Sequence, residues 1–346
     1  MKRALSFDDV LIIPQRSIVD SRNDIILETQ LTRNIFLKIP LVSMCMDTVT
    51  EDAMAISMAQ LGGLGIIHRF CSIEDQVKMV QKVKQANPTY IVAASVGIKD
   101  DYLERAIELE KAGCDLIVID VANAHSNKCI NALKNLKQYV KKDILVGNVA
   151  TSQGCRDLIE AGADGIKVGI GNGTICKTRI VAGAGISQIT AIIDCYEVGR
   201  VYNVPIISEG GVKNSGDIVK AIVAGSNATI IGSLFAGTDE APGKIIEDGD
   251  LKYKEYRGMM SEESIKKRAT IFGQEKITTA VPEGIKSLVP YRGPVKNVID
   301  NLLGGIRSGL SYCGVVHLRN AVGRQYFVEI TNAGLKESHP HSVKIA

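Results

Sequence analysis

One recurring pattern constrains the fold of this chain more than any other feature. A helical stretch ends at glycine, a short polar turn follows, and a run of apolar residues then begins, at Gly62, Gly113, Gly162 and Gly225. Glycine suits the position after a helix because other residues adopt the left-handed backbone there only with a side-chain clash. The pattern therefore predicts helices that each lead through a tight turn into a buried strand.

Apolar runs of strand length occur eight times, over residues 39–44, 63–68, 91–97, 116–121, 143–149, 165–171, 204–211 and 228–233. Their apolarity is continuous rather than alternating, which indicates that helices cover both faces of the sheet. Strands that alternate with helices in this way predict a closed (β/α)8 TIM barrel, with an open doubly wound sheet as the structural alternative. We expect one catalytic domain over residues 1–346.

Further helices, a flap and one more strand are expected besides the eight barrel strands. Residues 72–85 predict a helix, because Ser72 can cap it and apolar residues recur on one face. Residues 237–292 have weak periodicity and follow the eighth strand, so they predict a long flap over the catalytic end of the barrel. A helix near 294–308 and a strand near 325–330 should follow.

Composition and charge exclude several classes of protein. The net charge is only +3 and the charges are interspersed, so no basic stripe for nucleic acid is expected. The N-terminus lacks a signal-peptide core, and no run of about 18 apolar residues occurs, so the chain is expected to be cytoplasmic without a membrane partner. The eight cysteines form no CxxC pair, which argues against a zinc site or a disulfide framework.

The strongest candidate for chemistry lies after the sixth strand, where residues 169–178 read GIGNGTICKT. Active sites of TIM barrels form at the C-terminal ends of the strands, and alternating glycines let the backbone approach a ligand closely. Cys176 then lies among exposed amides that can favour a nucleophilic thiolate. The alternative is an inert, packed cysteine beside a tight turn.

The loops after strands seven and eight predict a phosphate site, since amides of Gly211, Gly232 and Ser233 could cradle a dianion. Glu209 would then accept hydrogen bonds from ribose hydroxyls; a solvated loop carboxylate is the alternative. Further polar residues follow the strands and indicate a ligand cavity: Asp120, Asn123 and Asn148. Asp47 and His68 also follow strands, and for each two interpretations stay open: a residue of this cavity, or one that simply satisfies local backbone groups.

Together these residues closely resemble the inosine monophosphate dehydrogenase and guanosine monophosphate reductase family. The resemblance covers nearly the whole chain and rests on LSFDDVLIIP, MDTVTE, GIIHRFCSIEDQ, KVGIGNGTICKTRIVAGAG, YRGM, VPEGIKSLVPYRGPV, GGIRSG and ESHPH. It implies a homotetramer in which Cys176 attacks purine C2, with GMP or IMP as the ligand. It also implies a proton relay through Thr178 and Glu283.

The resemblance implies three sets of binding residues. The nucleotide would contact Met46, Asn148, Thr174, Glu209, Gly210, Gly211, Gly232, Ser233, Tyr256, Gly258 and Met259. The nicotinamide cofactor, NADPH or alternatively NAD, would contact Asp120, Val121, Ala122 and Asn123. Carbonyls of Gly171, Gly173 and Cys176 would hold a monovalent cation, which the resemblance implies is K+, helped by residues 337–339 of a neighbouring subunit.

The two branches of the family differ after the cysteine adduct forms. In the dehydrogenases of the family, an Arg-Tyr pair in the flap activates the water that hydrolyses the adduct. In this chain no tyrosine follows Arg268. The sequence DVANAHS at 120–126 also resembles the reductases. The chain also lacks a regulatory CBS insertion between strands two and three. We therefore expect NADPH-dependent reductive deamination of GMP to IMP, with a dehydrogenase lacking CBS domains as the alternative.

Some residues favour the dehydrogenase instead, and two others differ from the usual residues of the family. TVTE at 48–51, RIVAGAG at 179–185 and ESHPH resemble the dehydrogenases. Arg69 and Glu209 stand where the family usually has lysine and aspartate, and arginine cannot give up a proton as lysine can. Two other classes stay open, an FMN-dependent barrel enzyme and a nucleotide-binding sensor or scaffold.

Overall fold

The fold is built around a closed barrel of eight parallel strands. The computed structural model describes residues 1–99, 101–271 and 281–340, except for the side chains of 267–269 and 271. The barrel strands are β4(Leu41–Ser43), β5(Leu64–Ile67), β6(Ala93–Val96), β7(Leu116–Asp120), β8(Asp143–Val149), β9(Gly165–Val168), β10(Ile206–Glu209) and β11(Ala228–Ile231). Because β11 pairs in parallel with β4, the sheet has no edge and the predicted TIM barrel is confirmed.

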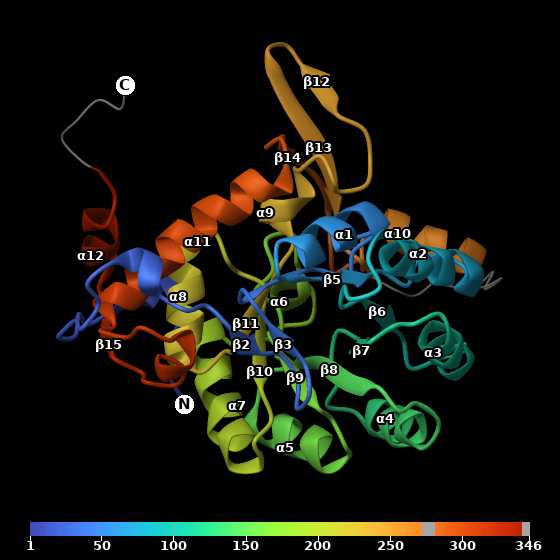
Figure 1. Ribbon diagram of the computed structural model, residues 1–346, viewed down its shortest axis with the longest axis horizontal. Helices are drawn as coiled ribbons and strands as arrows, with labels where there is room; N and C mark the ends of the chain where they lie inside the picture. Colours follow the sequence, from blue (N-terminus) through green and yellow to red (C-terminus); the bar gives the residue numbers. More distant parts are fainter. Residues whose placement is uncertain (100, 272–280, 341–346) are drawn as a thin grey trace.

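Helices surround the barrel and alternate with its strands (Figure 1). They are α1(Asp52–Gln60), α2(Ile73–Ala86), α3(Tyr102–Lys111), α4(Asn127–Tyr139), α5(Ser152–Glu160), α7(Gln188–Tyr202), α8(Ser215–Ala224) and α11(Val295–Tyr312). Each barrel strand is buried along nearly its whole length, as its continuous apolarity requires. None of the helices in the described part of the chain is long and apolar enough to cross a membrane.

Local sequence signals account for the connections. Gly62, Gly113, Gly162 and Gly225 all have positive φ, between 87° and 130°, so the predicted glycine turns are confirmed. The Ser72 hydroxyl accepts the backbone N–H of Asp75 at 3.1 Å and caps α2, as expected.

The segments outside the repeat join the two ends of the chain. Strand β1(Val10–Ile12) pairs antiparallel with β15(Phe327–Glu329), so the strand expected near 325–330 is present. A second small sheet pairs β2(Thr29–Gln30) with β3(Phe36–Leu37). The helix expected near 294–308 is α11, and the short elements are η1(Phe7–Asp9), η2(Arg22–Asp24), α6(Thr178–Val181), η3(Leu318–Asn320) and α12(Asn332–Glu337).

The flap lies between β11 and α11 and carries its own secondary structure. After α9(Ser233–Ala236), strands β12(Ile246–Asp248), β13(Leu251–Arg257) and β14(Lys286–Pro290) form an antiparallel sheet, and α10(Glu262–Ile271) follows β13. The β12–β13 hairpin extends away from the barrel (Figure 1). The base of this sheet, rather than its tip, lies next to the strand ends where the cavity opens.

Candidate active site

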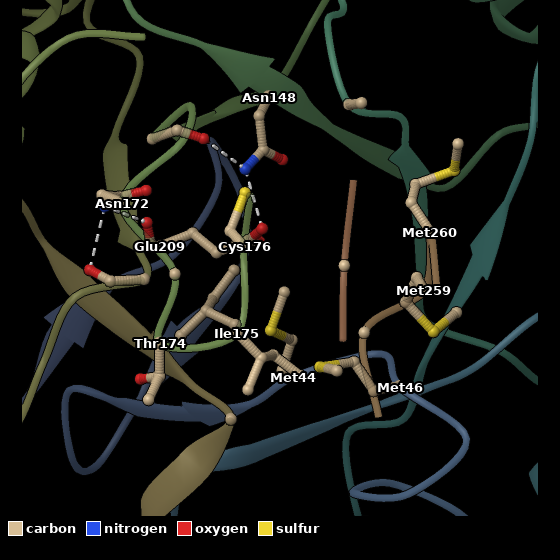
Figure 2. A pocket seen from close by; sticks show the side chains of 18 of the residues that line it. Met44, Met46, Asn148, Asn172, Thr174, Ile175, Cys176, Glu209, Met259 and Met260 are labelled. Carbon is tan, nitrogen blue, oxygen red and sulfur yellow. Dashed lines mark hydrogen bonds between the residues drawn. The ribbon is translucent and has the colours of Figure 1, made fainter. Parts of the chain in front are cut away.

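A cavity of about 210 Å³ opens at the C-terminal ends of the barrel strands. The loops after β4, β5, β7, β9, β10 and β11 line it together with two flap segments, 256–260 and 283–284. Met44, Met46, Met259 and Met260 gather on one side of the cavity, across from Asn172 and Glu209 (Figure 2). The cavity thus has a soft apolar wall facing a polar one, which suits a flat ring with a polar substituent.

Cys176 belongs to a short chain of hydrogen bonds that joins the barrel loop to the flap. Its Sγ lies 3.2 Å from Thr178 Oγ1, and Thr178 Oγ1 donates to Glu283 Oε2 at 2.7 Å. The backbones support this contact, because Lys177 N donates to the Glu283 carbonyl at 2.6 Å and Cys176 forms a β-bridge with Gly284. A thiol, a hydroxyl and a carboxylate are therefore aligned for proton transfer.

The glycines of the Cys176 loop are required by close backbone packing. Gly169 has φ of 148°, and a Cβ there would lie 2.1 Å from the Glu209 carbonyl oxygen. The Asn172 amide then spans the gap to β10, donating to the carbonyls of Glu209 at 2.9 Å and Gly210 at 3.1 Å. The loop is thus fixed against the neighbouring strand end, with the half-buried Cys176 facing the cavity.

Glu209 is buried and both of its carboxylate oxygens have partners. Oε1 accepts from Asn148 Nδ2 at 2.7 Å and Oε2 accepts from Lys167 Nζ at 2.7 Å. Lys167 also donates to Asp120 Oδ1 at 2.5 Å, which makes a buried carboxylate–ammonium–carboxylate group. Sequence analysis did not identify Lys167, although a lysine inside the apolar run GIKV signals a charged partner within the barrel.

The charges of this group reinforce one another. Burial alone would lower the pKa of Lys167, but the attraction of Asp120 and Glu209 outweighs it and holds that pKa above its ordinary value. Burial would likewise raise the pKa of Asp120, yet the Lys167 ammonium holds it below its ordinary value. The Lys167 cation and the Asp120 carboxylate therefore stabilise each other's charged forms inside the barrel.

The residues expected to form an anion cradle come from three loops and lie together in the cavity lining. Thr174 Oγ1 lies 3.4 Å from Ser233 Oγ, and Gly210 and Gly211 have φ of 88° and 80°. A Cβ on Gly232 would lie 2.5 Å from the Tyr256 hydroxyl, so this glycine admits the flap tyrosine. Burial raises the pKa of Tyr256 above its ordinary value, so the phenol keeps its proton and can donate to an anion.

A chain of charges anchors the flap to the barrel. The buried Asp47 carboxylate accepts from Arg257 Nη2 at 2.6 Å, and Arg257 continues to Glu255 at 3.0 Å. Glu255 in turn pairs with Lys286 at 2.7 Å on the adjacent strand β14. Asp47 therefore does more than satisfy local backbone groups, and the sequence does not reveal that Arg257, 210 residues away, approaches it.

His68 behaves as expected of a residue serving local backbone. Its Nδ1 accepts the backbone N–H of Phe70 at 3.1 Å, and its Nε2 lies 3.3 Å from Glu51 Oε1. No ligand role for this buried imidazole is needed to satisfy its nitrogens.

The cavity brings together nearly all of the residues predicted for the site. It is lined by Met46, Asp120, Val121, Ala122, Asn148, Gly171, Gly173, Thr174, Cys176, Thr178, Glu209, Gly210, Gly211, Gly232, Ser233, Tyr256, Gly258, Met259 and Glu283. Asn123 is the exception, because its exposed side chain accepts the backbone N–H of His125 at 3.1 Å outside the lining. The side chain of Arg268 and residue His341 of the ESHPH motif lie outside the described residues.

Several lining residues were not predicted, among them Met44, Asn172 and Met260. The arginine that stands in place of the usual lysine, Arg69, also lines the cavity. Its guanidinium lies 5.0 Å from the ring centroid of Phe70 and donates to the Asp120 carbonyl at 3.4 Å. In the part of the chain that the structure describes, no three His, Cys, Asp or Glu residues cluster to bind a metal ion.

A family model and two curated relatives all point to one family of enzymes. The family model described as "IMP dehydrogenase / GMP reductase domain" matches residues 4–341. An inosine-5'-monophosphate dehydrogenase from Cryptosporidium parvum is 42% identical over 387 residues, which cover 99% of this chain and 96% of the relative. A GMP reductase from Leishmania donovani is 34% identical over 480 residues, covering 99% and 98%.

The solved structures include a close match in fold. A GMP reductase variant from Trypanosoma brucei, in complex with guanosine 5'-monophosphate, superposes with a TM-score of 0.93. It is 32% identical, and the match covers 99% of both chains.

The anchoring of the flap predicts the effect of Arg257→Met. The change removes the Arg257 guanidinium from the Asp47 carboxylate, whose side chain is 1% exposed, and breaking a buried pair in this way costs about 3–5 kcal/mol. Amide hydrogen exchange should therefore accelerate in β13 and β14 while the barrel strands stay protected. Lys286→Met, at the more exposed end of the charge chain, should have a much smaller effect. Unchanged exchange in β13 of Arg257→Met would show that the pair does not hold the flap.

Proposed function

Because this chain belongs to the IMP dehydrogenase / GMP reductase family, whose members are oxidoreductases, we propose that it is a GMP reductase. The reaction is the NADPH-dependent conversion of GMP to IMP and ammonia. The observation that carries the proposal is the Cys176–Thr178–Glu283 chain, in which a nucleophile and a proton relay meet. The sequence adds that no tyrosine directly follows Arg268.

The first half of the reaction uses this relay. The Cys176 sulfur bonds to purine C2, and the proton of the thiol passes through Thr178 to Glu283. Glu283 returns the proton to the 2-amino group, the C2–N bond breaks, and ammonia leaves. The purine is then held on Cys176 as a thioimidate, with atoms and charge balanced. A relay that both accepts and donates a proton suits this exchange better than it suits hydrolysis.

The second half needs a reductant whose reactive end reaches purine C2 beside Cys176. When bound, NADPH supplies the hydride that C2 accepts as the sulfur departs. Asp120, Val121 and Ala122 line the same cavity as Cys176 and would hold that end of the cofactor. Because the first proton left with ammonia, a second proton must enter from solvent; passed through Glu283 and Thr178, it returns the departing thiolate to the thiol.

The remaining parts of the proposal concern binding and assembly. GMP places its phosphate among Thr174, Gly211, Ser233 and Tyr256, and its ribose on Glu209. Carbonyl oxygens of Gly171, Gly173 and Cys176 are the ligand type that K+ prefers, and positive φ at Gly171 shapes that loop. We propose a single catalytic domain without CBS domains, which acts in the cytoplasm as a homotetramer.

A second candidate, an IMP dehydrogenase that uses NAD, is favoured by one observation. The Cryptosporidium parvum relative, which is 42% identical, bears the dehydrogenase name. That likeness is spread over the whole chain, whereas hydrolysis of the adduct depends on a general base for water. Reductases from Leishmania are 34% identical over almost the same share of this chain, so overall identity does not separate the two activities.

The covalent role of Cys176 predicts the effect of Cys176→Ser. A hydroxyl is a much weaker nucleophile than a thiolate, so turnover of GMP should fall to background. Nucleotide affinity, measured by calorimetry, should stay within about threefold because the phosphate and ribose contacts remain. Cys71→Ser, at a half-exposed cysteine outside the cavity lining, should keep normal turnover. Parallel loss of affinity and rate in Cys176→Ser would contradict a covalent role.

The relay predicts that Glu283→Gln lowers kcat of GMP reduction by about 10²-fold or more. The amide keeps the hydrogen bond to Thr178 but can no longer take up the thiol proton. Affinity for GMP should change little, since Glu283 contacts the reacting group rather than the phosphate site. Glu262→Gln, an exposed carboxylate on the flap helix α10, serves as the control. Normal kcat in Glu283→Gln would remove Glu283 from the reaction.

A further inference from the structure

Lys167 lies inside the barrel, beneath the cavity rather than on its lining, and its side chain is 0% exposed. A buried ammonium is costly unless ion pairs and hydrogen bonds compensate for lost hydration. Here the compensation comes from two carboxylates on different strands, Asp120 at the end of β7 and Glu209 at the end of β10. Lys167 therefore connects the ends of β7 and β10, both of which line the cavity.

Strand β8, which lies between β7 and the lysine's own strand β9, leaves space for this side chain. On β8, Gly147 is the register partner of Asp120, and a Cβ there would lie 2.3 Å from Lys167 Cβ. Any side chain at Gly147 would thus displace the stem of Lys167. Four adjacent strands together contribute a carboxylate, a gap, an ammonium and a second carboxylate.

The result is a fixed orientation for Glu209. Each carboxylate oxygen can accept two hydrogen bonds, and each already accepts one, from Asn148 and from Lys167 respectively. One acceptor position per oxygen stays available, and Glu209 lines the cavity. Two oxygens with one open position each match the two hydroxyls of a vicinal diol.

We propose that Lys167 is a positioning residue that makes the nucleotide site selective for ribose over 2'-deoxyribose, acting through Glu209. This inference rests on the proposed function, since it concerns the ribose of the same nucleotide. Without the ammonium, the two buried carboxylates repel each other and Glu209 loses the partner that fixes its rotamer. The loss should fall on recognition of the diol and leave the phosphate contacts intact.

The test is calorimetric binding of GMP, 2'-deoxyGMP, IMP and 2'-deoxyIMP without cofactor. The wild-type protein should bind each ribonucleotide about tenfold or more tighter than its deoxy counterpart, because a missing hydroxyl leaves buried acceptors unpaired. Lys167→Met should reduce this ratio to about twofold or less by weakening ribonucleotide binding, with deoxynucleotide binding nearly unchanged. Retained deoxynucleotide binding also shows that the variant is folded.

Three further variants separate positioning from general stability. Lys167→Arg should restore most of the ratio, since arginine keeps the charge between the carboxylates. Lys254→Met removes another buried lysine, which bonds the carbonyls of Thr238 and Ala241, and should leave the ratio unchanged. If Lys167→Met fails to fold, Lys167→Gln supplies a polar neutral substitute and should show the same loss of ratio.

A double-mutant cycle tests whether Lys167 acts through Glu209. Lys167→Met and Glu209→Gln should each lower the ratio, and the double variant should lower it no further. A wild-type ratio in Lys167→Met or Lys167→Gln, or additive effects in the double variant, would overturn the proposal. The test measures binding and not turnover. The affinity ratio can therefore be interpreted even if the protein catalyses the dehydrogenase reaction. Absence of GMP and IMP binding by the wild type would overturn both the nucleotide site and this inference.

Discussion

Closure of the eight parallel strands is the constraint on which the site depends. It brings the C-terminal ends of β7, β9, β10 and β11 into one ring, although these ends are spread over more than 100 residues of the chain. Asp120 and Glu209 at two of those ends therefore contact the buried Lys167 inside the barrel instead of lying in water. Electrostatic interactions are stronger in such a setting, so a few side chains can fix the orientation of a ligand.

The flap completes what the barrel begins. Barrel loops provide the thiol and the anion cradle, while the flap provides Glu283 for the relay and Tyr256 for the cradle. The two parts are joined by the Asp47–Arg257 pair and by backbone bonds between Lys177 and Glu283. The position of these two flap residues therefore depends on how firmly the base of the flap is held, whereas the exposed strand β12 contributes no residue to the cavity lining.

Much of the barrel could be predicted from sequence because its signals are local. Continuous apolar runs mark strands covered on both faces, and the glycines after the helices have the backbone conformation that only glycine adopts readily. The flap sheet could not be predicted, since β12 is fully exposed and β14 alternates between exposed and half-buried residues. Its antiparallel pairing supplies a stability that its apolar content does not signal.

The candidate site shows the same division. Cys176 and Glu209 could be found because they follow buried strands or glycine turns, and Thr174, Thr178 and Glu283 through resemblance. The partners of Lys167, Asp47 and Arg257 could not, because each depends on strand register or on a contact between distant segments. Asn123 follows the right strand, but the chain turns before its side chain reaches the cavity.

The claim that most needs a direct measurement is that the Cys176 adduct is reduced rather than hydrolysed. Nicotinamide absorbance should be followed in two reactions of the purified protein, GMP with NADPH, and IMP with NAD in the presence of potassium. The account predicts steady loss of NADPH with GMP, and at most one equivalent of NADH per site from IMP. Sustained NADH production from IMP, without NADPH loss from GMP, would contradict it and would mean that another group activates water.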